Sequence, residues 1–205
     1  VRLAAFMSFA VAAILGVILV GLVGQWWLLL VGVASVAAAW LYTGGPSPYG
    51  YFGLGEVFVF VFFGLVAVAG STYVHTLTIT WRSIGAGVAS GSLAVAILLA
   101  NNLRDIPTDV VAGKKTLAVR LGDPRTRVAY SIALAIPYVI AVAIAISGTP
   151  WALLAFASAP LTLSPLRQVR GGAVGRGLIP VLVSTGVLLL GYAVSLSIGL
   201  VISAV

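Results

Sequence analysis

The sequence predicts an all-α fold, a polytopic bundle of transmembrane helices, and three observations lead to this prediction. Hydrophobic residues make up 61% of the 205 residues and charged residues only 7%, and the mean hydropathy is +1.20. This composition excludes the water-soluble classes, in which about 25% of residues are charged. The apolar residues are gathered in runs of roughly 20, the length that a helix needs to cross the hydrocarbon core. Short polar segments separate the runs, and none of them is long enough to link two domains.

Seven such runs are present, and we therefore expect seven transmembrane helices within a single domain that covers residues 1–205. In chain order the expected helices are Leu3–Val23, Trp26–Leu41, Leu54–Val74, Ile84–Ala100, Val128–Ile146, Trp151–Leu166 and Leu178–Ile202. The absence of cysteine excludes a disulfide framework and thiolate metal sites.

The first three runs are delimited by residues that interrupt helices. Gly24 and Gln25 form a tight break between the first run and the second. The second run is short, but tryptophan and tyrosine stand at its ends, as is typical of the membrane interface. The loop Tyr42–Gly53 follows, and its glycines and prolines cannot continue a helix.

The remaining runs are delimited in the same way. Tyr73–Ser83 is a polar connection, Ser147–Pro150 a short turn, and Arg167–Gly177 a basic loop before the last run. Within the fourth run, Gly87 and Gly91 are spaced four residues apart. This small-xxx-small pattern predicts that a neighbouring helix approaches closely.

The basic residues indicate how the chain is oriented in the membrane. Seven spans place the N-terminus and the loops after the second, fourth and sixth spans on one side, together with ten of the eleven Lys and Arg residues. Only Arg82 falls on the other side. Because short loops rich in Lys and Arg remain in the cytoplasm, we expect a multi-pass protein of the cell membrane with these loops cytoplasmic. This orientation accounts for the net charge of +7, and we expect no nucleic-acid partner.

The charge of the chain is concentrated in residues 101–127, which hold three of its four acids and six of its eleven basic residues. Asp105 and Asp109 are four residues apart, so on a helix both carboxylates lie on one face. Hard oxygen ligands suit Mg²⁺, and neighbouring Lys and Arg side chains suit the remaining charge of a phosphate. The stretch therefore predicts a diphosphate site that opens to the cytoplasm.

The pattern has an alternative interpretation, because most charge runs are solvated ion pairs. Asp105 and Asp109 would then pair only with neighbouring Lys and Arg residues. Asn101 and Asn102 favour the functional interpretation. Polar side chains at the end of an apolar membrane helix are unfavourable in free energy unless they are hydrogen-bonded, and they often belong to functional sites. Pro107 lies between the two acids, and we expect the helix to kink or restart there.

A second group of candidates lies before the third run. Glu56 stands near the start of that helix, where the helix dipole alone would favour a carboxylate, so a structural role and a site role both stay open. Tyr49 and Tyr51 lie in a Gly/Pro-rich loop on the acid-bearing side. They are either aromatic residues of the membrane interface or contacts of an aromatic or prenyl substrate, and with Glu56 they form a possible substrate cavity.

Two segments carry a resemblance to a known family. NNLRDIPTDVVAGKKTLAVRLGD, residues 101–123, resembles the second aspartate-rich motif of the UbiA superfamily of membrane prenyltransferases, in its 1,4-dihydroxy-2-naphthoate polyprenyltransferase (MenA-type) branch. YTGGPSPYGYFGLGEVFVFVFFG, residues 42–64, is also similar to that branch. The resemblance runs over essentially the whole chain.

The resemblance implies a nine-helix fold whose cavity opens to the cytoplasm and laterally to lipid, with the seven runs here as its last seven helices. The family also has a first aspartate-rich motif after its second helix, and nothing like it precedes Leu3. We therefore expect a domain truncated at its N-terminus, with half of the Mg²⁺ cage and no activity on its own.

The resemblance also implies roles for individual residues. Asp105 and Asp109 would bind Mg²⁺ and serve catalysis, whereas Lys115 stands where the family pattern has arginine. The implied diphosphate-binding residues are Asn101, Arg104, Lys114 and Lys115.

The implied reaction is transfer of a polyprenyl group from an allylic polyprenyl diphosphate to 1,4-dihydroxy-2-naphthoate, with decarboxylation, giving demethylmenaquinone. The long prenyl tail would lie in membrane lipid. The sequence identifies no base that would accept a proton. Two alternatives stay open: transfer to another acceptor within the superfamily, and a protein that binds or transports isoprenoid diphosphates without catalysis.

Overall fold

The computed structural model describes residues 2–44 and 48–203, and this part of the chain is helical with short connections. All seven predicted apolar runs are helical over most of their length, so the all-α prediction is confirmed. The chain divides into two compact units, Val1–Gly50 and Tyr51–Val205. Each unit is described by itself.

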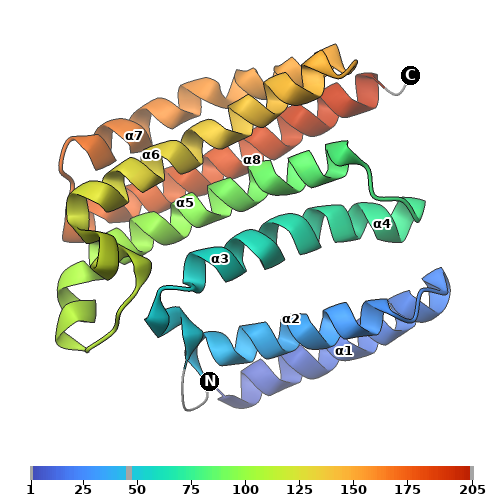
Figure 1. The fold of residues 1–205 in the computed structure, drawn as a ribbon, viewed down its shortest axis with the longest axis horizontal. Coiled ribbons are helices and arrows are strands. Elements are labelled where there is room, and N and C mark those ends of the chain that lie inside the picture. Colours follow the sequence, from blue (N-terminus) through green and yellow to red (C-terminus); the bar gives the residue numbers. More distant parts are fainter. Residues whose placement is uncertain (1, 45–47, 204–205) are drawn as a thin grey trace. The chain divides into compact units, whose positions relative to one another are not determined.

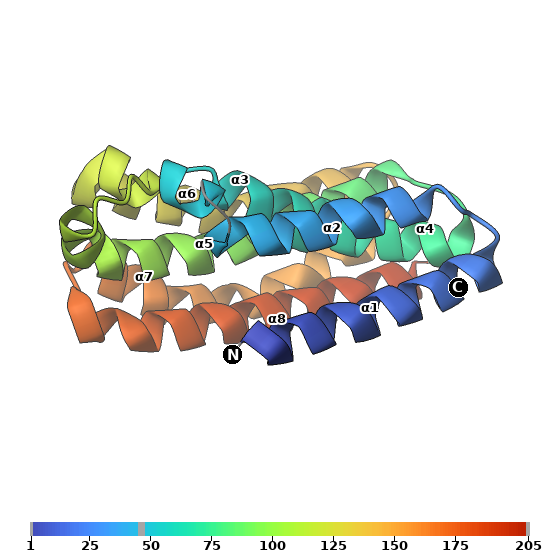
Figure 2. The same cartoon turned by 90° about the horizontal axis from the view of Figure 1, so that it is seen from below.

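The first unit is a helical hairpin. Helix α1 covers Arg2–Val23 and helix α2 covers Leu28–Thr43, joined by a turn in which Gly24 takes a φ of +75° that favours glycine (Figure 2). The rings of Phe6 and Trp40 pack with their centroids 5.0 Å apart. Helix α2 begins and ends two residues later than predicted, because the tryptophans before it form the turn.

The predicted loop after α2 contains one turn of 3-10 helix, η1 (Tyr49–Phe52). Tyr49 donates a hydrogen bond from its hydroxyl to the carbonyl of Ala38, 2.6 Å away. Residues 45–47 of this loop lie outside the described residues.

The second unit begins with one uninterrupted helical rod made of α3 (Gly55–Val59), the π-helix η2 (Phe60–Ala69) and α4 (Gly70–Thr76). The rod ends where Leu77 adopts a left-handed conformation, with a φ of 54°. Helix α5 (Trp81–Val111) then begins with a reciprocal cap between Thr80 and Ser83.

Helix α5 and the rod meet through glycines. A Cβ atom on Gly64 of η2 would lie 2.6 Å from both the carbonyl oxygen of Gly87 and the Cα of Gly91. Only hydrogen at these positions lets the two backbones come this close. The predicted small-residue face at Gly87 and Gly91 is thus confirmed, and η2 is the helix that uses it.

The other side of α5 packs on the C-terminal helices (Figure 1). These are α6 (Leu117–Ile146), the 3-10 helix η3 (Pro150–Thr162), α7 (Leu163–Arg170), the short η4 (Gly175–Leu178) and α8 (Ile179–Ile202). Buried tyrosines tie them together: the hydroxyls of Tyr130 and Thr185 are 2.7 Å apart, and Tyr192 donates to the carbonyl of Pro137 at 2.7 Å. The apolar helices of the second unit are therefore held together by close packing and by a few satisfied polar pairs.

Five of the helices are long and apolar enough to cross a membrane, judged by length and composition. They are Leu3–Val23, Gly55–Thr76, Trp81–Val111, Leu117–Ile146 and Gly175–Ile202. Helix α2 is shorter, with 16 residues. Many large apolar side chains point outward from these helices, which suits contact with lipid and supports a multi-pass membrane protein.

Candidate functional site

The charged stretch forms the end of α5, the connection to α6 and the start of α6. Helix α5 continues beyond the predicted apolar run, through Pro107, as far as Val111, and its end bends away from the rest of the helix (Figure 1). Asp105 and Asp109 therefore lie on one helix, one turn apart.

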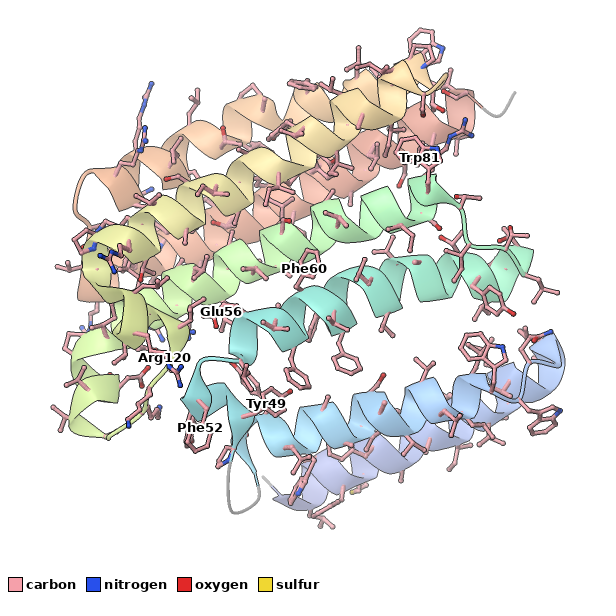
Figure 3. All side chains as sticks on the ribbon, in the orientation of Figure 1. Tyr49, Phe52, Glu56, Phe60, Trp81 and Arg120 are labelled. Carbon is pink, nitrogen blue, oxygen red and sulfur yellow. The ribbon has the colours of Figure 1, made fainter. Side chains whose placement is uncertain are left out.

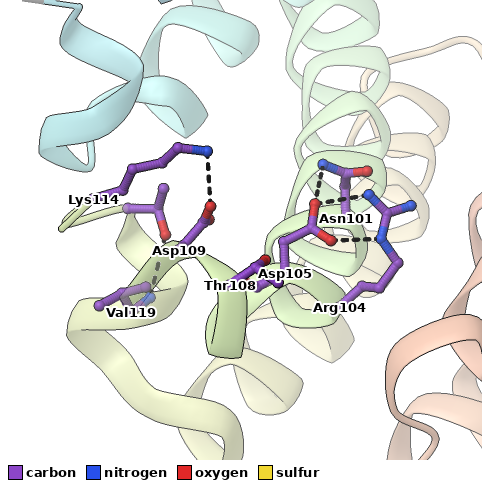
Figure 4. A network of polar contacts seen from close by, with 8 residues as sticks. Asn101, Arg104, Asp105, Thr108, Asp109, Lys114 and Val119 are labelled. Carbon is purple, nitrogen blue, oxygen red and sulfur yellow. Dashed lines mark hydrogen bonds and ion pairs between the residues drawn. The ribbon is translucent and has the colours of Figure 1, made fainter. Parts of the chain in front are cut away.

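Asp105 is held by two side chains of its own helix (Figure 4). Arg104 donates from Nε to Oδ1 and from Nη2 to Oδ2, both at 2.7 Å. The amide of Asn101 donates to Oδ2 at 3.5 Å. Arg104 thus binds the carboxylate of Asp105 with two parallel hydrogen bonds. The same planar guanidinium group can bind two oxygens of a phosphate in this way.

Asp109 forms the second part of the site and is far more enclosed, with 7% of its side chain exposed against 31% for Asp105. Lys114 donates to its Oδ1 at 2.9 Å, and the same ammonium group lies 5.0 Å from the centre of the Tyr51 ring. This hydrogen bond to Asp109 raises the pKa of Lys114 above its usual value. Lys114 is therefore a fixed cation at neutral pH.

The loop that carries Tyr51 is tied to the loop that carries Lys114. The backbone N–H of Lys115 donates to the carbonyl of Tyr51 at 2.8 Å, and Nε of Arg120 donates to the carbonyl of Lys115 at 3.1 Å. Gly53 has a φ of +74°, and a Cβ there would lie 3.1 Å from Nε of Arg120. The side chain of Lys115 is exposed, and its backbone N–H and carbonyl join the two loops.

Glu56, labelled in Figure 3, makes a third polar contact, with Asn102. Asn102 donates from Nδ2 to Oε1 of Glu56 at 2.9 Å. Glu56 is 5% exposed, and its second oxygen, Oε2, is buried without a hydrogen-bond partner. This contact joins α3 to α5 across 46 residues of sequence.

Tyr49 lies in the first unit, with its hydroxyl bonded to helix α2 as described above. Burial, and then the proximity of Tyr42, raise the pKa of this hydroxyl. The other predicted residues belong to the second unit. The side chains of all of them except Lys115 take part in the three contacts just described: Asp105 with Asn101 and Arg104, Lys114 with Asp109 and Tyr51, and Glu56 with Asn102.

Both interpretations of the charged stretch find support here. Asp105 and Asp109 each pair with a cation, as the alternative interpretation predicts. The described residues contain no group of three or more His, Cys, Asp or Glu side chains that would hold a metal ion alone. Two carboxylates one turn apart do fit Mg²⁺, which commonly takes one or two protein carboxylates and completes its shell with water and substrate phosphates.

Sequence reasoning missed one polar cluster outside these contacts. Arg127 donates from Nε and Nη2 to Asp123 at 2.6 and 2.7 Å, from Nη2 to the carbonyl of Ala173 at 3.0 Å, and from Nη1 to the carbonyl of Val169. The i, i+4 spacing of Asp123 and Arg127 is a sequence signal for their pair. Nothing local predicts the two carbonyls, which lie in the last turn of α7 and just after it.

Residues 2–172 match the UbiA prenyltransferase family. The chain belongs to this family. It is 48% identical over 194 residues to a 1,4-dihydroxy-2-naphthoate octaprenyltransferase of Mycobacterium tuberculosis, an alignment that covers 95% of the chain and 66% of the relative. A relative of the same name in Bacillus subtilis is 34% identical over 204 residues, 97% of the chain and 64% of the relative.

A third relative, a 2-carboxy-1,4-naphthoquinone phytyltransferase of Synechocystis, is 31% identical over 165 residues, which cover 78% of the chain and 53% of the relative. The alignments with the naphthoate octaprenyltransferases include almost the whole of this chain. The chain spans about two thirds of the length of these relatives.

Proposed function

We propose that this UbiA-family chain belongs to a magnesium-dependent membrane enzyme that transfers a polyprenyl group from an allylic polyprenyl diphosphate to 1,4-dihydroxy-2-naphthoate, with decarboxylation, giving demethylmenaquinone. The observation that carries the proposal is the pair of carboxylates at the end of α5, each beside a cation. The names of the relatives in Mycobacterium tuberculosis and Bacillus subtilis supply the donor class and the acceptor.

Asp105 and Asp109 would hold Mg²⁺ against the diphosphate. When bound, Mg²⁺ would neutralise the charge that develops on the diphosphate as it leaves the allylic carbon. Arg104 and Lys114 now pair with these carboxylates at 2.7 and 2.9 Å, and they are long enough to exchange a carboxylate partner for a phosphate oxygen. Once paired with phosphate oxygens, these cations would stabilise the negative charge that develops on the leaving diphosphate.

The position of the site in the fold suits an amphiphilic donor. The carboxylates stand where an apolar helix becomes polar, so a diphosphate would bind at the membrane boundary while its prenyl tail lies among apolar helices. Each CH₂ group kept from water in this way is worth about 0.8 kcal/mol. The distribution of Lys and Arg favours a site on the cytoplasmic side.

Membranes that carry the full-length gene product test the proposal. They are incubated with a polyprenyl diphosphate, Mg²⁺ and a panel of aromatic acceptors, and prenylated products are identified by mass spectrometry. We expect product with 1,4-dihydroxy-2-naphthoate, and none after chelation of divalent cations. Product with another acceptor and none with the naphthoate would favour the first alternative, and diphosphate binding without any product would favour a binding protein.

Two variants test the assignment of the carboxylates. Asp105→Asn and Asp109→Asn should each lower kcat by about a hundredfold or more and raise the Mg²⁺ concentration needed for half-maximal rate. Asp123→Asn is the matched control, since it removes a carboxylate from the same region that pairs with Arg127 instead. If the first two variants turn over as fast as this control, the metal assignment is wrong.

A further inference from the structure

Glu56 differs from the other three acids of the chain in its partner. Asp105, Asp109 and Asp123 each form an ion pair with Arg or Lys. Glu56 is bonded to the neutral amide of Asn102. All four acids are among the described residues, so Glu56 is the single carboxyl group here that no described cation neutralises.

The second oxygen of Glu56 is left without any donor. Oε2 is buried and makes no hydrogen bond, although the residue as a whole is 5% exposed. Buried polar atoms in proteins nearly always make a hydrogen bond, and one that makes none lowers the free energy of unfolding. Oε2 therefore calls for a hydrogen-bond donor that the described chain does not supply.

Glu56 lies close to the proposed diphosphate site. Its partner Asn102 precedes Asp105 by three residues on α5, a rise of about 4.5 Å along the helix axis. Asn101, next to Asn102, donates to Asp105 itself. Glu56, through its partner Asn102, therefore lies within about one helical turn of Asp105, where the diphosphate would bind.

We propose that Oε2 of Glu56 accepts a hydrogen bond from a ring hydroxyl of the aromatic acceptor and takes that proton when the prenyl group is transferred. This inference rests on the proposed function and adds the proton acceptor that the reaction requires. Asn102 is a positioning residue, because its hydrogen bond holds Oε1 and leaves Oε2 as the oxygen available to the acceptor.

The step balances without a further reactant. The ring carbon forms a bond to the first carbon of the prenyl group, and the bond from that carbon to the diphosphate oxygen breaks with its electron pair leaving on the diphosphate. The hydroxyl proton moves to Oε2, and the O–H electron pair becomes a ring carbonyl. The attacking carbon is the one that bears the carboxylate. This carboxylate leaves as carbon dioxide, the electron pair of the broken C–C bond restores the aromatic ring, and the carbonyl oxygen takes the proton back from Oε2.

The surroundings of Glu56 suit this role better than those of the aspartates. Each aspartate already faces a cation, whereas Glu56 faces a neutral amide and has an oxygen left to accept a substrate hydroxyl. Helix α3 packs against η2 and α5. The segment η2 (Phe60–Ala69) has no titratable side chain, and the charged groups at this end of α5, namely Arg104, Asp105 and Asp109, are occupied in the pairs described above.

The test compares Glu56→Gln, Glu56→Asp and the control Asp123→Asn in membranes carrying the full-length gene product. Rates are measured from acidic to alkaline pH with each substrate varied in turn, and melting temperatures are recorded in detergent. We expect Glu56→Gln to lower kcat by about a hundredfold or more, the usual contribution of a general base. The KM for the prenyl diphosphate should stay within about threefold, and the loss of rate at acidic pH should disappear.

Glu56→Asp retains a carboxylate and should recover at least part of the rate, whereas Asp123→Asn should stay within about threefold of the unmodified protein. The inference is overturned if Glu56→Gln keeps its rate and its acidic limb. It is equally overturned if Gln and Asp variants are inactive alike and both melt at lower temperature, since Glu56 would then be structural. If the unmodified protein forms no prenylated naphthoate, the proposed function itself has failed, which the same assay reveals first.

Discussion

The close approach of η2 to α5 allows a sharp prediction about stability and activity together. In Gly64→Ala the new Cβ would lie 2.6 Å from the carbonyl oxygen of Gly87 and from the Cα of Gly91. Both are backbone atoms and cannot rotate away. Ordinary contact begins at 3.4 Å, so the rod and α5 must separate by about 0.8 Å at this point, and such overpacking costs about 1–3 kcal/mol.

Gly70→Ala is the matched control, because Gly70 lies in the same rod and a Cβ there meets nothing within 4 Å. Both changes gain the helix propensity of alanine, about 1 kcal/mol, so the difference between the two variants isolates the clash. We expect Gly64→Ala to melt about 2–10 °C below Gly70→Ala in detergent.

The same displacement reaches the site. A rigid shift of the rod by this amount would stretch the contact between Asn102 and Glu56 from 2.9 Å to at most about 3.7 Å, beyond a hydrogen bond. Prenyl transfer should therefore fall in Gly64→Ala and persist in Gly70→Ala. Equal melting temperatures and equal rates for the two variants would refute the reasoning, because the helices would then tolerate separation.

Three further predictions concern cations. Lys114→Gln should raise the KM for the prenyl diphosphate by about tenfold or more, which corresponds to the loss of a hydrogen bond to a charged group. Lys115→Gln is the comparison and should raise this KM less, because the side chain of Lys115 is exposed. Equal effects of the two changes in kinetic assays would show that Lys114 has no special role. Because its carboxylate partner raises the pKa of Lys114, its charge and the stability it contributes are present below the usual lysine pKa and are lost only as the pH rises through the higher folded value. A KM for the diphosphate that is flat from about pH 7 to pH 10 is therefore expected, and a steep rise in that range would contradict it. Arg127→Ala removes the side-chain donor to the carbonyl of Ala173 and one of the two donors to that of Val169, which keeps the N–H of Gly172. The free energy of unfolding should fall by about 1–3 kcal/mol, measured by denaturation in detergent, with an unchanged midpoint as the contrary result.

Part of the candidate site was predictable from local pattern. The i, i+4 spacing of Asp105 and Asp109 predicted carboxylates on one helix face, and α5 carries both. The neighbouring Arg104 and Lys114 lie within five residues of their partners, so their pairing also follows from short spacing. Pro107 was the uncertain element, because a proline within a helix removes one hydrogen bond and either ends or bends it. Here α5 bends and continues.

The remaining contacts were beyond sequence reasoning. Asn102 was recognised as a costly polar residue, but its partner Glu56 lies 46 residues away. The approach of Lys114 to Tyr51, and of Arg127 to the carbonyls at the end of α7 and just after it, likewise depends on how distant segments pack. No periodicity or spacing within a segment encodes which residues of another segment it will meet.

The sequence by itself determined the membrane class, the all-α fold, the approximate helices and the charged end of α5. These follow from run length, helix-breaking residues and charge, which act over a few residues and are therefore readable in order along the chain. The tertiary structure alone decided that Gly64 is the residue against Gly87 and Gly91, and that a buried carboxyl oxygen of Glu56 is left without a donor. Such features arise when helices pack, because close packing selects which small residues touch and which polar atoms lose their water.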